Sequence, residues 1–180
     1  MKRRTIENLC TVLMIILTLF VSSYCSMTDE NWTVLLLRPE KKLLYVFGTL
    51  GSTLFCFLLY QLSKRVKKPQ RALCFMTMMC MPLSLMFVYD PDVHQMETTF
   101  HLLFSYLYFF GINASIIISL FQLHFRNTKL FHHLAQLYGL ILAGCAAICM
   151  HYMVINTLFE LYFTCATTCF ISYSLHRLKE

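Results

Sequence analysis

Residues that could act as acids, bases or metal ligands gather in one stretch near the middle of the chain. Asp90, Asp92 and His94 lie in a short polar segment, and His101 begins the apolar run that follows. His151 lies at the end of a later apolar run, where a helical bundle would bring it to the same side. Because carboxylates and imidazoles bind Zn²⁺ and activate water, these five residues predict a candidate zinc site.

Three positions are candidates for catalysis or for contact with a ligand. Ser105 follows His101 by four residues, so the two would share one face of a helix. Glu160 lies at the edge of the last apolar run, where an unpaired carboxylate is costly. We expect Glu160 to find a partner, either His101 or His151.

A purely structural interpretation of the same polar stretch stays open. A loop outside the membrane should be polar in any case. Asp92, Thr98 or Thr99 would then cap the next helix. The Glu97 carboxylate would interact favourably with the positive end of the helix dipole.

The composition indicates the elements that must position these residues. The chain has 180 residues, of which 58% are hydrophobic and 13% charged, whereas soluble domains run at about 45–50% apolar and about 25% charged. Six apolar segments are long enough to cross a bilayer, and in hydrocarbon each must pair its own backbone groups as a helix. The sequence therefore predicts one all-α domain over residues 1–180, a polytopic transmembrane bundle with spans near 9–24, 43–62, 72–89, 100–123, 134–150 and 158–175.

The basic residues predict the orientation of this bundle. Twelve of the fifteen lie in the amino terminus, the second and fourth connections and the tail, and the other three are Arg38, Lys41 and Lys42. The positive-inside rule then places both termini and the basic loops in the cytoplasm. A cleaved signal peptide is the alternative for the first segment, with Met1–Arg4 as its basic start and Val21-Ser22-Ser23 as its cleavage site; it would leave five spans.

Several smaller expectations concern packing. Pro82 should kink the third segment, and Asn113 should hydrogen-bond a neighbouring helix. Residues 32–37 are apolar enough to lie on the outer membrane surface, with Trp32 at the interface. Small residues around Gly144 predict a tightly packed, central fifth helix.

The nine cysteines do not predict a disulfide framework, because most of them lie inside apolar runs. We interpret them as small residues that pack between helices. Two pairs spaced by four residues, Cys145 with Cys149 and Cys165 with Cys169, leave a soft-metal site as the alternative.

One part of the chain resembles a known family. The acid–proline element Asp90-Pro91-Asp92, the segment from His101 to Ser105 and the long aromatic and aliphatic helix to Leu120 are similar to a bacterial six-span membrane family of unknown function, allied to the DRAM/FRAG/Sfk-type proteins. The proline between two acids departs from that pattern. The resemblance implies a lipid-related or membrane-organising role in the bacterial cytoplasmic membrane. It also implies that His101 is the functional residue that this chain shares with the family.

These features favour an integral membrane protein without an enzymatic reaction, which binds lipid or a membrane-protein partner and needs no cofactor. The sequence has no phosphate-binding glycine loop, no nucleophile elbow and no zinc-protease helix. An intramembrane, zinc-assisted lipid hydrolase and a small oligomeric transporter or channel subunit are the alternatives. The uneven distribution of basic charge argues against nucleic acid as a partner, and self-association into a homo-oligomer stays open.

Overall fold

The computed structural model describes residues 3–67, 69–90 and 92–178, and within these ranges the chain forms helices and no strand. The all-α prediction is therefore confirmed. Lys68 and Pro91, one of the residues in the family resemblance, lie outside the described residues. The elements are α1 (Arg3–Ser22), the 3₁₀ helix η1 (Trp32–Leu37), α2 (Lys41–Arg65), α3 (Arg71–Leu85), α4 (Gln95–His124), α5 (Thr128–Tyr152) and α6 (Thr157–Arg177).

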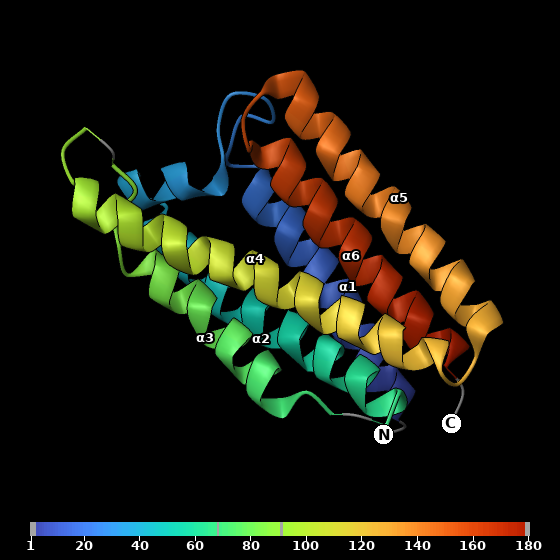
Figure 1. Cartoon of the computed structure of the whole chain (residues 1–180). Coiled ribbons are helices and arrows are strands. Elements are labelled where there is room, and N and C mark those ends of the chain that lie inside the picture. Colours follow the sequence, from blue (N-terminus) through green and yellow to red (C-terminus); the bar gives the residue numbers. More distant parts are fainter. Residues whose placement is uncertain (1–2, 68, 91, 179–180) are drawn as a thin grey trace.

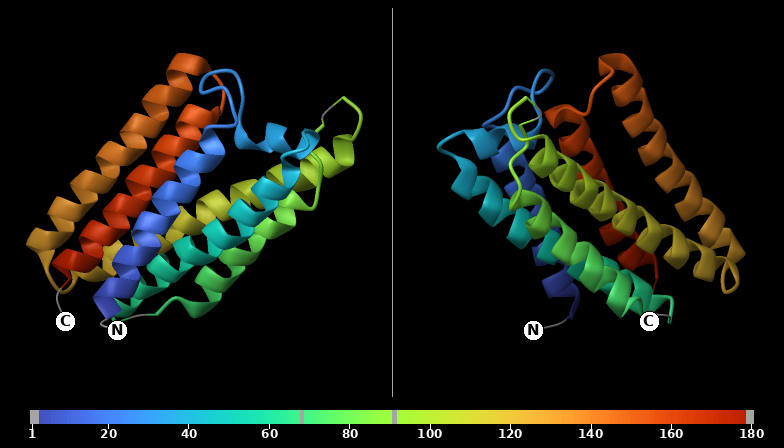
Figure 2. Two further views of the ribbon diagram at one scale, coloured as in Figure 1. Left: turned by 180° about the vertical axis from the view of Figure 1, so that it is seen from behind. Right: turned by 60° about the vertical axis from the view of Figure 1, so that its left-hand side comes forward.

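The long helices form two groups that diverge from a common end (Figures 1 and 2). One group contains α2, α3 and α4, and the other contains α1, α5 and α6. We call the end where the groups converge the narrow end; it carries both termini and the connections 66–70 and 125–127. We call the opposite end the wide end; it carries the connections 23–40, 86–94 and 153–156, with η1 lying between the two groups.

A buried ion pair ties the helices together at the narrow end. The Arg65 guanidinium of α2 contacts the Glu7 carboxylate of α1 at 2.8 Å, with the two side chains only 5% and 6% exposed. The same guanidinium donates to the carbonyl oxygens of Leu175, at 2.8 Å, and Leu178, at 3.0 Å. Because one planar group serves α1, α2 and the end of α6, the distances among these three helices are fixed there.

Both a small residue and a polar side chain determine how α4 packs against its neighbours. A Cβ atom added at Gly111 would lie 2.2 Å from Oγ1 of Thr77, so α3 and α4 approach as closely as they do only with glycine there. The Tyr138 hydroxyl donates to Oδ1 of Asn113 at 2.6 Å and joins α5 to α4. This bond confirms that Asn113 links neighbouring helices.

Each of the six predicted segments contains a helix, but the third is shorter than expected. Helix α3 has 15 residues and ends at Leu85, three residues after Pro82, whereas the prediction ran to residue 89. By length and composition, α1 from Arg4, α2, α4 and α5 are each able to cross a membrane. All nine cysteines are free thiols, as the sequence indicates.

Two packing predictions were wrong. Trp32, Leu35 and Leu36 of η1 are buried and pack in one cluster with Phe47 and Leu85, so this segment does not lie on an outer surface. The diverging helices leave room for these side chains between them. Helix α5 lies at the edge of the bundle with most of its surface exposed, and the missing side chain of Gly144 makes space for the Tyr162 ring.

Replacing Arg65 by methionine should lower the free energy of unfolding by about 3–5 kcal/mol, because removing one partner of a buried ion pair leaves the other charge poorly compensated. Lys64→Met is the matched control at an exposed neighbour and should change that free energy by less than about 0.5 kcal/mol. Unfolding of the detergent-purified protein by heat or by sodium dodecyl sulfate measures both. Equal losses for the two variants would contradict the role of Arg65.

Candidate functional site: a cavity at the wide end

A cavity of about 700 Å³ opens between the two helix groups at the wide end. Its walls come from η1, α2, α4 and α6. It extends from the exposed loop residues Asp29 and Val154 to Ile112, which is 1% exposed at the centre of α4. This volume lies within the range of about 300–1,000 Å³ that small-molecule sites occupy.

The cavity walls are mainly apolar and rich in aromatic rings. Phe109 of α4 lies 4.8 Å from Phe163 of α6 between ring centroids, and Phe159 and Phe163 stack at 6.3 Å. Across the cavity, the Trp32 ring meets Phe47 of α2 edge to face at 4.9 Å. Surfaces of this kind take up the hydrocarbon part of a ligand, while a few polar groups orient the rest of it.

His101 holds the end of α3 and lines the cavity. Its Nδ1 lies 3.0 Å from the carbonyl oxygen of Ser84 and 3.2 Å from that of Phe87. Two carbonyl acceptors identify Nδ1 as the donor, so a neutral ring keeps Nε2 as an acceptor. The side chain thereby satisfies carbonyl groups that the end of α3 leaves without helical partners. The sequence points to His101 but not to this role.

Ser105 also lines the cavity, yet its hydroxyl does not pair with His101. The Ser105 Oγ lies 2.7 Å from the Ser84 Oγ, and the Ser84 hydroxyl donates to the carbonyl oxygen of His101 at 3.1 Å. A serine nucleophile needs a base within hydrogen-bond reach. The base nitrogen nearest to these hydroxyls is already donating to two carbonyls, so the arrangement positions polar groups and does not activate a nucleophile.

Glu160 is the third catalytic candidate that lines the cavity. Its Oε2 accepts the backbone N–H of Trp32 at 2.7 Å, and the Trp32 indole Nε1 donates to the Ser22 hydroxyl at 3.1 Å. The partner of Glu160 in the described structure is thus the start of η1, and neither His101 nor His151 bonds to it. The three catalytic candidates are brought to one cavity: the Ser84 hydroxyl contacts both His101 and Ser105, whereas Glu160 is held separately by Trp32.

The first turn of α6 holds the 23–31 loop in place. The Asn156 side chain accepts the N–H of Phe159 at 3.0 Å, which caps the helix, and donates to the carbonyl oxygen of Thr28 at 3.2 Å. The Thr157 hydroxyl donates to the carbonyl oxygen of Glu30 at 2.9 Å. Leu158 donates its N–H to the carbonyl oxygen of Met27 at 3.0 Å. The donors at the start of this helix are thereby used to dock a loop.

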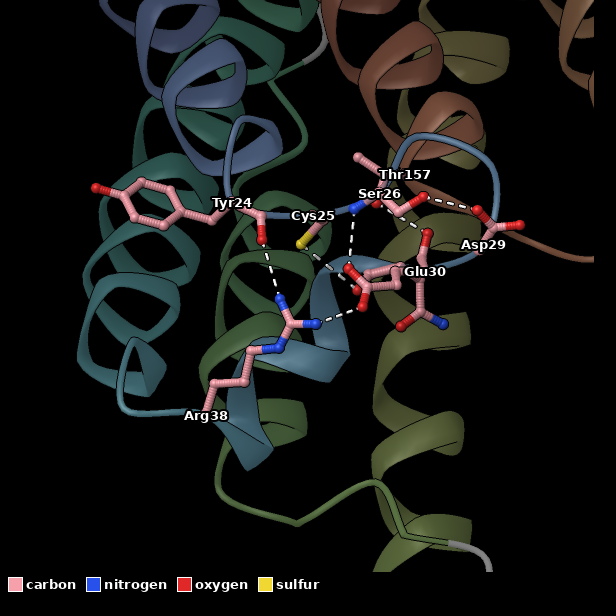
Figure 3. A network of polar contacts seen from close by, with 8 residues as sticks. Tyr24, Cys25, Ser26, Asp29, Glu30, Arg38 and Thr157 are labelled. Carbon is pink, nitrogen blue, oxygen red and sulfur yellow. Dashed lines mark hydrogen bonds and ion pairs between the residues drawn. The ribbon is translucent and has the colours of Figure 1, made fainter.

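A polar network stabilises the docked loop from within (Figure 3). The Arg38 guanidinium lies between the carbonyl oxygen of Tyr24, at 3.1 Å, and the Glu30 carboxylate, with which it forms an ion pair. Hydrogen bonds from the Ser26 and Thr28 hydroxyls hold the pKa of Asp29 below its usual value. The loop is therefore an ordered wall of the cavity with its charges largely matched.

The zinc candidates do not surround one point. Asp90 accepts the N–H of Val93 through Oδ1 at 3.3 Å, while Asp92 and His94 are exposed in the connection before α4. His151 is exposed at the end of α5, beside the Tyr152 ring. Among the described residues, no group of three or more His, Cys, Asp and Glu side chains is arranged to hold a metal ion.

The predicted capping of α4 follows a different pattern. His94 occupies the position before the helix and makes no side-chain cap. The Thr98 hydroxyl accepts the N–H of Asp90 at 2.9 Å, and the Thr99 hydroxyl donates to the carbonyl oxygen of Gln95 at 2.9 Å. These threonines therefore fix the approach to the helix without capping its first turn.

The role of the 23–40 connection was missed from the sequence. Its contacts with α6 join residues more than a hundred positions apart, such as Trp32 and Glu160, and no spacing rule covers such a pairing. The available signals were the apolar run Trp32–Leu37 after a polar loop and an asparagine, Asn156, that precedes the last apolar segment. Neither signal says which elements will meet.

Comparisons with known proteins give no match: no family model, no curated protein and no solved structure corresponds to the chain. The resemblance to the six-span bacterial family therefore stays a prediction. The function has to be inferred from the cavity and from the helices that form it.

His101→Ala should destabilise the protein by about 2–4 kcal/mol, because it removes the donor for two carbonyls and leaves a void. His132→Ala is the control at an exposed position and should be close to neutral. Thermal unfolding in detergent compares the two variants. Equal tolerance of both would show that the His101 contacts do not hold the end of α3.

Proposed function

We propose that this protein is a six-span integral membrane protein whose wide-end cavity binds the hydrocarbon part of an amphipathic lipid. The observation that carries the proposal is the cavity itself, with about 700 Å³ of space and aromatic walls from α2, α4, α6 and η1. A few polar side chains, among them Ser105, Asn156 and Glu160, line the same space and would orient a polar head. The bound ligand would enter from the surrounding lipid or from the wide end.

Six spans are supported by how the short third helix is completed. Helix α3 alone would rise about 22 Å for its 15 residues, less than the roughly 30 Å hydrocarbon core. Beyond its end, His101 donates to the carbonyl oxygens of Ser84 and Phe87. Non-helical backbone is tolerated at membrane depth only where its polar groups are satisfied inside the protein. Residues 86–89 meet that condition in part and can complete the crossing.

The distribution of basic residues supports a cytoplasmic narrow end. Of the described basic residues, Arg3, Arg4, Lys64, Arg65, Lys67, Arg71, Arg126, Lys129 and Arg177 lie toward that end, whereas Arg38, Lys41 and Lys42 lie at the wide end. The positive-inside rule then directs the cavity mouth away from the cytoplasm. In a bacterial cytoplasmic membrane, the cavity would face the outer leaflet.

Binding agrees better with the contacts of the site than hydrolysis or transport does. The Ser105 hydroxyl bonds to Ser84, and the His101 Nδ1 donates to carbonyls, so the catalytic candidates form no nucleophile and base. A transport path through the bundle would need Asn113 to face it. Both polar atoms of the Asn113 amide are instead engaged, by the Phe109 carbonyl and the Tyr138 hydroxyl.

The proposed orientation predicts which tags are accessible in intact cells. An epitope tag inserted after Asp92, in the wide-end connection, should bind antibody without permeabilisation. A tag on the carboxyl terminus should bind only after permeabilisation. Surface labelling of a carboxyl-terminal tag in sealed cells would overturn the orientation, and the Asp92 insertion provides the internal control for expression.

The cavity also predicts a saturable interaction that can be followed by fluorescence. Trp32 is the chain's single tryptophan and lines the cavity. A dibrominated octadecanol, whose bromine atoms quench tryptophan on contact, should therefore quench the purified protein with a saturating titration. Thr164→Phe, which adds bulk to the cavity wall, should weaken the apparent affinity by about tenfold, equivalent to about 1.4 kcal/mol.

Ala147→Phe is the matched control, because it adds a ring at an exposed position of α5 that does not line the cavity. Its titration should stay within about twofold of the unmodified protein. Quenching that rises linearly with probe and is unchanged by Thr164→Phe would mean that the probe reaches Trp32 from the micelle, and the binding proposal would fail.

A further inference from the structure

The charged side chains in the cavity wall are all acidic. Asp29, Glu30 and Glu160 line the cavity, and none of the described lining residues is a lysine or an arginine. A phosphate, sulfate or carboxylate head would thus meet three carboxylates, of which only Glu30 has a cation, Arg38, beside it. The apolar walls would bind cationic, neutral and anionic amphipaths with equal affinity. The negative charge of these carboxylates is what would distinguish the three classes.

Two of the three carboxylates are already engaged. Glu30 forms its ion pair with Arg38 and also accepts the N–H of Ser26 at 2.8 Å. Asp29 is exposed and accepts the hydroxyls of Ser26 and Thr28 at 2.8 and 2.9 Å. Glu30 therefore has its counter-charge in Arg38, and the charge of the exposed Asp29 is screened by solvent.

Glu160 is in a different situation. The hydrogen bond from the Trp32 N–H favours a negative charge on Glu160, but burial of the carboxyl group in the apolar wall is the larger effect and opposes that charge. Within the described ranges, however, no lysine, arginine or histidine forms an ion pair with it. A carboxylate at the wall of an apolar cavity has little water to solvate it, so a cation that enters the cavity would gain a counter-charge there.

The surroundings of Glu160 also suit a cation. Phe159 is its neighbour in α6, and Phe163 lies one turn further along the same face. Phe109 packs against Phe163 across from α4 at 4.8 Å, so these rings and the Glu160 carboxylate line the same cavity. Ring faces attract ammonium groups, and the attraction grows when water is excluded.

We infer that the cavity is selective for an amphipath with a positively charged ammonium head, which Glu160 and the neighbouring phenylalanine rings would contact while the chain occupies the apolar walls. This inference rests on the proposed function, because it assigns the head of the ligand whose hydrocarbon part the cavity holds. Anionic amphipaths with the same hydrocarbon chain bind more weakly, because the carboxylates repel their heads.

The test uses three probes with one dibrominated octadecyl chain and different heads: a trimethylammonium, an alcohol and a sulfate. A quaternary ammonium keeps its charge at every pH, so the comparison does not depend on titration of the probe. With the full-length protein in an uncharged detergent, the ammonium probe should quench Trp32 with at least about tenfold higher affinity than the alcohol. The sulfate should bind more weakly than the alcohol.

Glu160→Gln keeps an oxygen acceptor for the Trp32 N–H and removes only the charge. It should bring the ammonium affinity to within about twofold of the alcohol affinity while leaving alcohol binding intact. Glu40→Gln is the matched control, since it removes an acid at the same end that does not line the cavity, and it should preserve the preference.

Equal affinities of the ammonium and alcohol probes for the unmodified protein would overturn the assignment of the head and leave the hydrocarbon site standing. An ammonium preference that survives Glu160→Gln would overturn the role of Glu160. Failure of all three probes to quench in a saturable way would remove the proposed function together with this inference.

Discussion

The buried ion pair between Glu7 and Arg65 is the constraint on which the arrangement of the other helices depends. Arg65 binds Glu7 of α1 and the last carbonyls of α6 at once, so three helices meet at fixed distances at the narrow end. Desolvating both charges is costly, and the complementary geometry of guanidinium and carboxylate offsets that cost. With one end held in this way, the two helix groups can diverge toward the other end without the bundle coming apart.

The divergence of the two helix groups leaves space between them at the wide end, and side chains fill only part of it. The 3₁₀ helix η1 turns Trp32, Leu35 and Leu36 into it, and His101 completes the end of α3 on the opposite side. What remains is a cavity with aromatic walls and one carboxylate, Glu160, that lacks a cation in the described structure. The buried ion pair thus holds the narrow end, while the cavity lies at the wide end.

The sequence predicted the elements well and their contacts poorly. Continuous apolar runs identify helices because lipid demands internal backbone pairing, and Asn113 was recognised because an amide in such a run needs a partner. The central placement of α5 was wrong, since small residues such as Gly144 can equally admit a neighbour's ring at the edge of a bundle. His101, Ser105 and Glu160 were identified from their types, yet the cavity they share comes from the pairing of η1 with α6, which residue types do not encode.

The bond from Trp32 to Glu160 joins positions 128 residues apart, near the beginning and the end of the chain. During synthesis the first connection must therefore wait for the last helix before it can take up its final place. Until then η1 and its apolar side chains have no partner on α6, and the cavity lacks a wall. Because Phe159, Glu160 and Phe163 all belong to α6, a chain cut before Thr157 would lack this wall of the cavity.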